Sequence, residues 1–184
     1  MGCGHDSCGC GGGSGSGHAQ VEDPMAAFVE MAALAPEHKH LEAFIGEWNA
    51  EVKIWMGQGE PQVTRGVMVN TFILGGRFIE QKYQGHGYDF QGSGLFGYNK
   101  ASGKFEGLWI DTMSTMMQTD IGTYDPGKKT FTMLSKVNCS EMGEMTRTSL
   151  IKVHGPDKHV MEMYFAPQGG TEDKCMEITY TRRK

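Results

Sequence analysis

Residues 46–56, GEWNAEVKIWM, decide how the chain folds. From Trp48 onward, apolar residues occupy every second position, and polar residues such as Glu51 and Lys53 stand between them. A two-residue period is that of a β-strand with one face buried and the other in water. The pattern before Gly46 has a helical period instead, so the first strand of the protein starts at this glycine.

Similar runs continue to the end of the chain, and each is bounded by turn residues such as the Gly75-Gly76 pair. The nine further strands are predicted near residues 63–74, 77–85, 92–99, 103–111, 115–123, 129–137, 145–153, 158–166 and 173–182. About ten strands with no helix between them predict a sandwich or a barrel. We predict a mainly β fold, a single antiparallel up-and-down β-barrel of about ten strands, because closing the meander leaves no exposed edge.

The N-terminal part has a different composition. Residues 1–22 are rich in Gly and Cys and lack large apolar side chains between Met1 and Val21, so we expect a flexible tail. Residues 23–184 are predicted to form a single β-barrel domain with one or two short helices at about 24–45. Asp23 and Pro24 suit the start of the first helix, and Pro36 suits the start of the second.

Charge and hydropathy exclude several function classes. The net charge is −5, and no run of Lys or Arg precedes the last three residues, so we expect no nucleic-acid partner. No apolar stretch reaches the roughly 20 residues that a membrane span requires, and no secretory signal is visible. We therefore expect a cytoplasmic protein without a membrane partner.

Five motifs carry a resemblance to a known family. They are HKHLEAFIGEW (38–48), LGGRFIEQKYQG (74–85), GLFGYN (94–99), FEGLWIDTMS (105–114) and MEITYTR (176–182). Together they resemble, over roughly residues 37–184, the bacterial family catalogued as "domain of unknown function 1579". The resemblance implies a calycin-like barrel related to lipocalins and to the nitrobindin-type haem barrels. It implies no activity.

The Gly46-Glu47-Trp48 sequence also resembles the Gly-x-Trp signature of lipocalin-like barrels. This resemblance implies that Trp48 plugs one end of the barrel and that Arg182, from the last strand, packs over its ring. A guanidinium over an indole contributes roughly 1 kcal/mol when it is shielded from water. The alternative is an ordinary core tryptophan and a solvated arginine.

A candidate metal site lies in the tail. Cys3, His5, Cys8 and Cys10 place three thiols and an imidazole within eight residues. Such ligands suit a zinc or copper ion, although the spacing matches no standard zinc finger. The alternative is a tail that binds metal only adventitiously.

A candidate ligand site lies on the predicted inner face of the barrel. Trp109 and Asp111 share one face of their strand, and Met161, Met163 and Phe165 share one face of another. An apolar cavity with a few polar groups is typical of a small-molecule site. The alternatives are methionines that fill the core and an aspartate that caps the turn at residues 112–114.

The sequence argues against haem and against a recognisable enzyme. His159 follows directly on a predicted turn, so we expect it at the rim or surface rather than on a haem iron. No nucleophile elbow, phosphate-binding loop or His-Glu-x-x-His motif occurs. We therefore favour a protein that binds a small hydrophobic molecule in its barrel. The alternatives are soft-metal handling through the tail, an enzyme with scattered catalytic residues, and a purely structural or interaction protein. The sequence leaves a homodimer open.

Overall fold

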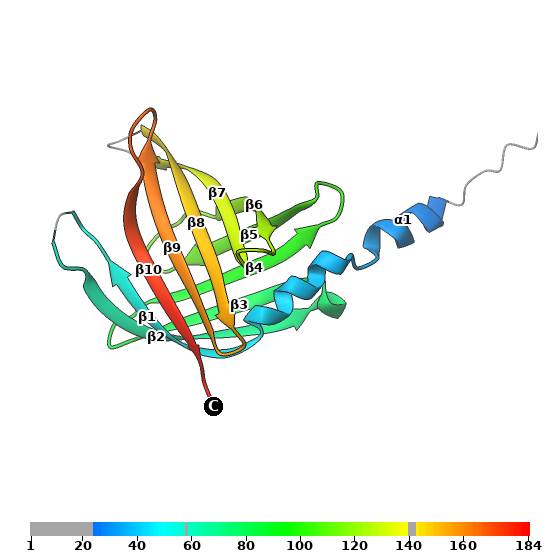
Figure 1. Ribbon diagram of the computed structural model, residues 1–184, viewed down its shortest axis with the longest axis horizontal. Coiled ribbons are helices and arrows are strands. Elements are labelled where there is room, and N and C mark those ends of the chain that lie inside the picture. Colours follow the sequence, from blue (N-terminus) through cyan, green and yellow to red (C-terminus); the bar gives the residue numbers. More distant parts are fainter. Residues whose placement is uncertain (1–23, 58, 140–142) are drawn as a thin grey trace, which may run out of the picture. The chain divides into compact units, whose positions relative to one another are not determined.

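The computed structural model describes residues 24–57, 59–139 and 143–184, and it confirms the predicted barrel (Figure 1). Each strand pairs antiparallel with the next along the chain, and the first also pairs with the last. The ten strands are β1 (Gly46–Ile54), β2 (Gln62–Ile73), β3 (Phe78–His86), β4 (Gln91–Asn99), β5 (Lys104–Asp111), β6 (Gln118–Asp125), β7 (Thr130–Cys139), β8 (Gly143–Gly155), β9 (Lys158–Pro167) and β10 (Asp173–Arg182).

The chain divides into two compact units, residues 1–33 and residues 34–184. The helix α1 (Pro24–Ala32) belongs to the first unit, and its large apolar side chains, such as Phe28, are exposed. Asp23, the predicted cap of this helix, lies outside the described residues. The second unit contains the barrel and the 3₁₀ helix η1 (Pro36–Phe44).

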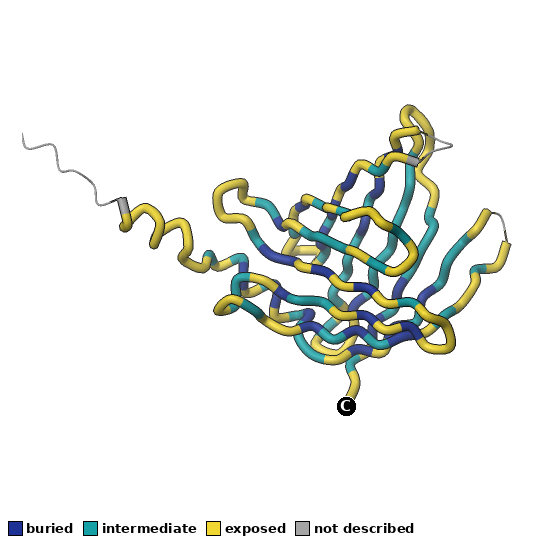
Figure 2. Tube along the Cα trace, turned by 180° about the vertical axis from the view of Figure 1, so that it is seen from behind, coloured by how far each residue is buried: buried dark blue, intermediate teal, exposed yellow. Residues whose placement is uncertain are grey.

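Buried and exposed residues alternate along most strands, as the sequence pattern predicts (Figure 2). In β1, Trp48, Ala50 and Val52 are buried, whereas Glu47 and Asn49 are exposed. Because successive side chains of a strand point to opposite faces, the buried set points into the barrel. The register carries the same inner face from strand to strand around the closed sheet.

The helix η1 closes one end of the barrel, which we call the proximal end. Leu41 and Phe44 from this helix are buried in an apolar cluster with side chains of β3 to β7. The strand residues of the cluster are Ile79, Phe96, Phe105, Phe131 and Met133. The sequence places a short helix here correctly. It forms as a 3₁₀ helix, which ends at Phe44, and its backbone then turns directly into β1.

The turn between β2 and β3 is longer than the two-residue Gly75-Gly76 turn that the sequence suggests. Ile73 pairs with Phe78, so four residues connect the strands. Leu74 has a φ of 50° and Gly75 a φ of 69°. The turn therefore begins in the left-handed region one residue before the glycines, a conformation that a non-glycine residue adopts less readily.

Position 46 requires glycine for two reasons, its backbone conformation and the close approach of the Arg182 side chain. Its φ is +120°, and a β-carbon there would lie 2.5 Å from Nη1 of Arg182. We expect Gly46→Ala to lower the free energy of unfolding by about 1–3 kcal/mol, because strained backbone and a displaced guanidinium act together. Urea unfolding followed by circular dichroism measures this.

The matched control for this prediction is Gly57→Ala. Gly57 has a nearly equal φ of +123°, but apart from its chain neighbours no atom of the described residues lies within 4 Å of the added β-carbon. It therefore reports the backbone strain alone. If both variants lose the same stability, the contact between residue 46 and Arg182 contributes nothing.

Candidate functional site

The half of the barrel away from η1, which we call the distal interior, combines apolar and polar side chains. The register places them on the inner face: Met161 lies opposite Ile178, and Met163 lies opposite Met176. The inward residues of this half include Trp109, Gln118, Asp120, Ser135, Arg147, Ser149, Met161, Met163, Phe165 and Met176.

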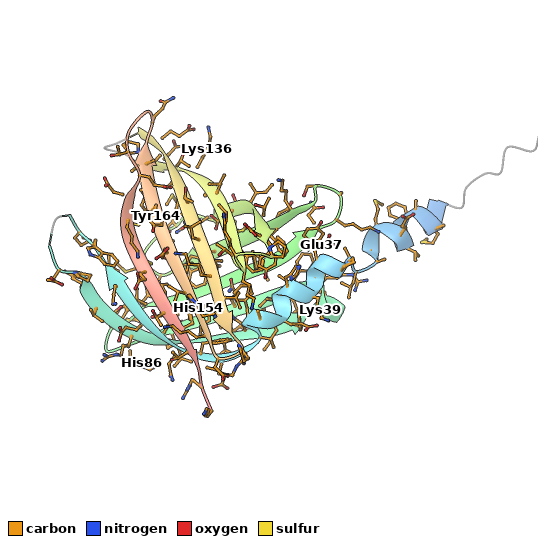
Figure 3. All side chains as sticks on the ribbon, in the orientation of Figure 1. Glu37, Lys39, His86, Lys136, His154 and Tyr164 are labelled. Carbon is orange, nitrogen blue, oxygen red and sulfur yellow. The ribbon has the colours of Figure 1, made fainter. Side chains whose placement is uncertain are left out.

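Water reaches the distal interior. Met161, Met163 and Phe165 point inward from β9, yet all three are half-buried, as is the outward-facing Tyr164 between them. Figure 3 labels Tyr164 in the distal half of β9 and His154 at the proximal end of β8. In a closed barrel, an inward side chain is partly exposed only if solvent enters from an end. The predicted residues of β9 therefore line a solvent-reached interior.

Trp109 lies flat against the barrel wall. A β-carbon added at Gly92 would overlap its ring, and one at Gly94 would lie 2.9 Å from it. The indole thus occupies the space that β4 leaves free by having glycine at these positions. Its Nε1 donates a hydrogen bond to Oδ2 of Asp111 at 3.0 Å.

Asp111 also caps the turn that follows β5. Its Oδ1 accepts a hydrogen bond from the backbone N–H of Met113 at 2.9 Å. Both carboxylate oxygens are therefore engaged, one with the turn and one with Trp109. The turn-capping alternative for this residue is confirmed, and Asp111 acts on the interior by holding the indole.

Three polar side chains that sequence reasoning missed meet in the distal interior, and we call them the polar floor: Gln118, Asp120 and Arg147. The Arg147 side chain is only 4% exposed. Its Nη2 donates to Oδ1 of Asp120 at 2.7 Å, and its Nη1 donates to Oε1 of Gln118. Its Nε is buried and has no hydrogen-bond partner among the described residues. A buried guanidinium held by one carboxylate and one amide is an uncommon feature of a barrel interior.

A sequence signal for Arg147 exists. Within the predicted strand 145–153, it shares parity with Ile151 and Val153, and this parity places it on the inner face. Arg147 is buried, as this parity predicts, although arginine side chains usually lie at the surface.

The proximal end contains the predicted plug pair. The Trp48 side chain is fully buried, and the Arg182 guanidinium lies 4.2 Å from the centre of its ring. Arg182 also donates to the carbonyl oxygens of Ile45 at 2.9 Å and Pro156 at 2.7 Å. These bonds tie the end of β10 to the start of β1 and to the β8–β9 turn.

His159 is buried, and the expectation of a rim or surface position is wrong. Its side chain is 4% exposed, stacks on Tyr180 at 4.5 Å and meets the ring of Trp48 edge-on at 4.4 Å. The residue does follow a turn, but Phe44 at the end of η1 covers it. Burial, together with the smaller effects of the nearby charges of Arg182 and His154, lowers the pKa of His159 to about 3.

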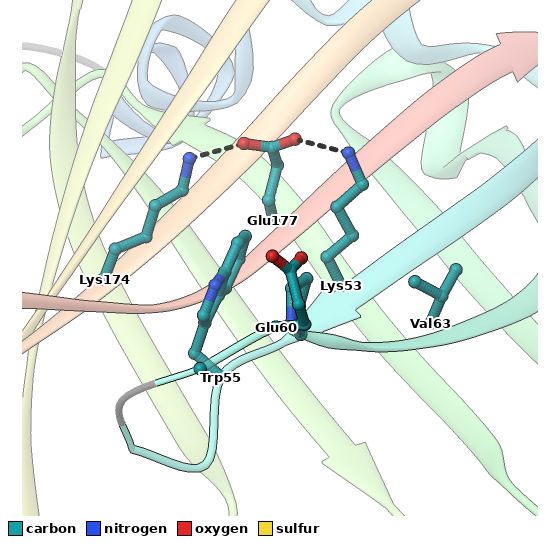
Figure 4. A pocket seen from close by; sticks show the side chains of 8 residues that line it. Lys53, Trp55, Glu60, Val63, Lys174 and Glu177 are labelled. Carbon is teal, nitrogen blue, oxygen red and sulfur yellow. Dashed lines mark hydrogen bonds and ion pairs between the residues drawn. The ribbon is translucent and has the colours of Figure 1, made fainter.

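A hollow of about 520 Å³ lies on the outer surface, where β1 and β10 run side by side (Figure 4). Three of the four charged side chains in its lining, all except Glu60, bind one another. Glu177 pairs with Lys53 at 3.6 Å and also with Lys174, which in turn lies 5.5 Å from the centre of the Trp55 ring. The hollow lies on the outside of the barrel. The polar floor lies in its interior and contains a buried donor, Nε of Arg147, that lacks a hydrogen-bond partner among the described residues, so the floor is the stronger candidate for recognition.

The metal prediction falls outside the described part of the chain, because Cys3, His5, Cys8 and Cys10 all precede residue 24. Within residues 24–57, 59–139 and 143–184, no three His, Cys, Asp or Glu side chains are grouped so as to hold a metal ion. The described helices fall short of the length and apolarity that a membrane crossing needs.

Comparisons with known proteins support the fold and the family resemblance. A family model described as "Protein of unknown function (DUF1579)" matches residues 34–182. No curated protein matches the chain. The crystal structure of Rv2717c from M. tuberculosis aligns with a TM-score of 0.57 at 13% identity, covering 83% of this chain and 100% of that one.

A second solved structure, the S-type phycobiliprotein lyase CPES from Guillardia theta, aligns with a TM-score of 0.56. The identity is again 13%, and the alignment covers 85% of this chain and 97% of the lyase. Identity this low shows a shared lipocalin-like barrel and nothing about activity. The resemblance carried by the five sequence motifs is confirmed by the family match.

Proposed function

Because the chain belongs to the family described as "Protein of unknown function (DUF1579)", which names no activity, we propose from its own residues that it binds a small, largely apolar molecule in the distal interior. The observation that carries the proposal is the partial exposure of inward-facing Met161, Met163 and Phe165. These apolar side chains inside the barrel remain in contact with water. A ligand that covers them removes this apolar surface from water, which lowers the free energy and favours binding.

The kind of lining supports the same function. Methionine side chains are flexible and polarisable, and they adapt to ligands of irregular shape. Trp109 adds a large flat surface that is fixed by its bond to Asp111. A barrel of eight or more strands is wide enough to hold one small ligand. An apolar lining with a few polar groups at one point is the usual composition of such a site.

The test is a fluorescence titration with the neutral apolar probe N-phenyl-1-naphthylamine. We expect the wild-type protein to bind it and Met163→Trp to weaken the binding about tenfold or more, because the larger ring fills the interior. Tyr164→Trp is the matched control. This neighbouring residue of β9 faces outward, and its hydroxyl contacts Glu162 at 3.3 Å.

Thermal unfolding of both variants shows whether each remains folded. A wild-type protein that does not bind the probe would contradict the proposal. Equal affinities of the Met163→Trp and wild-type proteins would contradict the location in the distal interior.

A further inference from the structure

The polar floor has a fixed pattern of donors and acceptors. Arg147 carries only N–H donors, so the Gln118 amide must turn its oxygen toward it. The Nε2 amino group of Gln118 therefore points away from the guanidinium and remains a donor. Asp120 accepts from Arg147 with Oδ1, and among the described residues its Oδ2 has no hydrogen-bond partner. The Asp120 side chain is 18% exposed, and Oδ2 is its oxygen that Arg147 leaves unused, so we assign Oδ2 as the acceptor that a ligand meets.

Arg147 itself is too deeply buried to be the contact. Water does not reach its Nε, and the whole side chain is only 4% exposed. Its effect on a ligand passes through the two residues that it holds, so it is a positioning residue. The surface that it presents consists of a carboxylate oxygen from Asp120 beside an amide N–H from Gln118, two residues apart on β6.

The charge of the floor is already balanced. The guanidinium of Arg147 and the carboxylate of Asp120 form an ion pair at 2.7 Å. A ligand carboxylate that approached Gln118 would lie close to Asp120. Two like charges about 5 Å apart in a partly buried site repel enough to lower affinity by about two orders of magnitude. The attraction of Arg147 offsets part of this, but the desolvation of a further charge adds to it.

We propose that the polar floor selects ligands whose polar end is uncharged and carries an acceptor beside a donor, as in a primary amide or a lactam. The carbonyl oxygen of the ligand accepts from Gln118 Nε2, and its N–H donates to Asp120 Oδ2. A carboxylate on the same apolar chain lacks the donor and adds a charge. This inference rests on the proposed function and specifies the ligand class.

The test measures how decanamide and decanoate displace N-phenyl-1-naphthylamine from the full chain at pH 8. The two ligands share their apolar part and differ only in the polar end. We expect decanamide to displace the probe from the wild-type protein at a concentration about tenfold or more below that of decanoate. Equal potency, or a preference for decanoate, would overturn the inference while probe binding leaves the proposed function intact.

Two variants change the charge of the floor. Asp120→Asn leaves Arg147 without a counter-charge, so we expect the preference to shift toward decanoate by about tenfold or more. The double variant Asp120→Asn/Arg147→Met removes both charges and avoids an unpaired buried cation. In this double variant we expect the preference for decanamide over decanoate to fall about tenfold, while the protein still binds the probe.

A structural role alone would change the affinity for both ligands equally and leave their ratio unchanged. An unchanged ratio in a folded Asp120→Asn protein therefore overturns the inference. If that variant does not fold, the ratio in the double variant decides in the same way. Failure of the wild-type protein to bind the probe at all is a different outcome, since it removes the proposed function together with this inference.

Discussion

Replacing Trp48 by alanine is expected to lower the free energy of unfolding by about 3–5 kcal/mol, the range of a fully buried large aromatic side chain. The ring is fully buried in the cluster formed by β1, β2, β3 and β10. Its Nε1 donates to the carbonyl oxygen of Phe44 at 2.7 Å, and Arg182 lies over its face. Removal of the indole leaves a cavity and a guanidinium without its aromatic partner. Urea unfolding followed by circular dichroism gives the value.

Two controls separate packing from hydrogen bonding and from the mere loss of a tryptophan. Trp48→Phe keeps most of the ring but loses the bond to Phe44, whose carbonyl still accepts from Asn70 at 2.9 Å. We expect it to cost about 1–2 kcal/mol. Trp109→Ala removes a half-buried indole from the distal interior, so its cost should lie well below that of Trp48→Ala. Equal costs for the two alanine variants would show that the proximal plug does not stabilise the barrel more than the lining of the interior.

The two-residue alternation of apolar and polar residues is enough to predict the barrel, because each strand buries one face and pairs with its neighbour along the chain. The predicted run at 158–166 corresponds to β9 (Lys158–Pro167), and the run at 145–153 lies within β8 (Gly143–Gly155). In a meander, local alternation fixes which side chains point inward without knowledge of distant contacts. The inner position of Met161, Met163 and Phe165 follows from this parity.

Contacts between distant segments are what the sequence hides. His159 is expected at the surface because it follows a turn, but Phe44, more than a hundred residues earlier, covers it. The Arg147–Asp120 pair joins residues that are 27 positions apart, on strands separated by β7. Parity places Arg147 inside, but nothing local shows which carboxylate will meet it. The strand register, which depends on turn lengths, decides that pairing.

The burial of His159 makes stability depend on pH. In the folded protein its pKa is lowered to about 3, first by burial and then by the charges of Arg182 and His154, whereas its ordinary value is 6.5. Above pH 6.5 neither the folded nor the unfolded state binds the proton. Between pH 6.5 and 3 the unfolded state binds it and the folded state does not. Stability is therefore fully present above pH 6.5 and is lost as the pH falls toward 3.

We expect the wild-type protein to lose about 1.4 kcal/mol per pH unit through this window, relative to His159→Phe. Phenylalanine retains an aromatic ring against Tyr180 and Trp48 but takes up no proton. Between pH 7 and pH 5 the difference in unfolding free energy between the two proteins should change by about 2 kcal/mol in favour of the variant. Urea unfolding at both pH values measures it, and the subtraction cancels the titration of the carboxylates that both proteins share.

Met133→Leu provides a second reference, because it changes packing in the proximal cluster without altering any titratable group. Its stability difference from the wild type should be the same at pH 7 and pH 5. If the stability difference between His159→Phe and the wild type is also the same at pH 7 and pH 5, the folded protein accepts a proton on His159 as readily as the unfolded chain does. That result would mean that η1 does not shield the imidazole in solution, since a charged imidazole enclosed by Phe44, Trp48 and Tyr180 would be strongly destabilised.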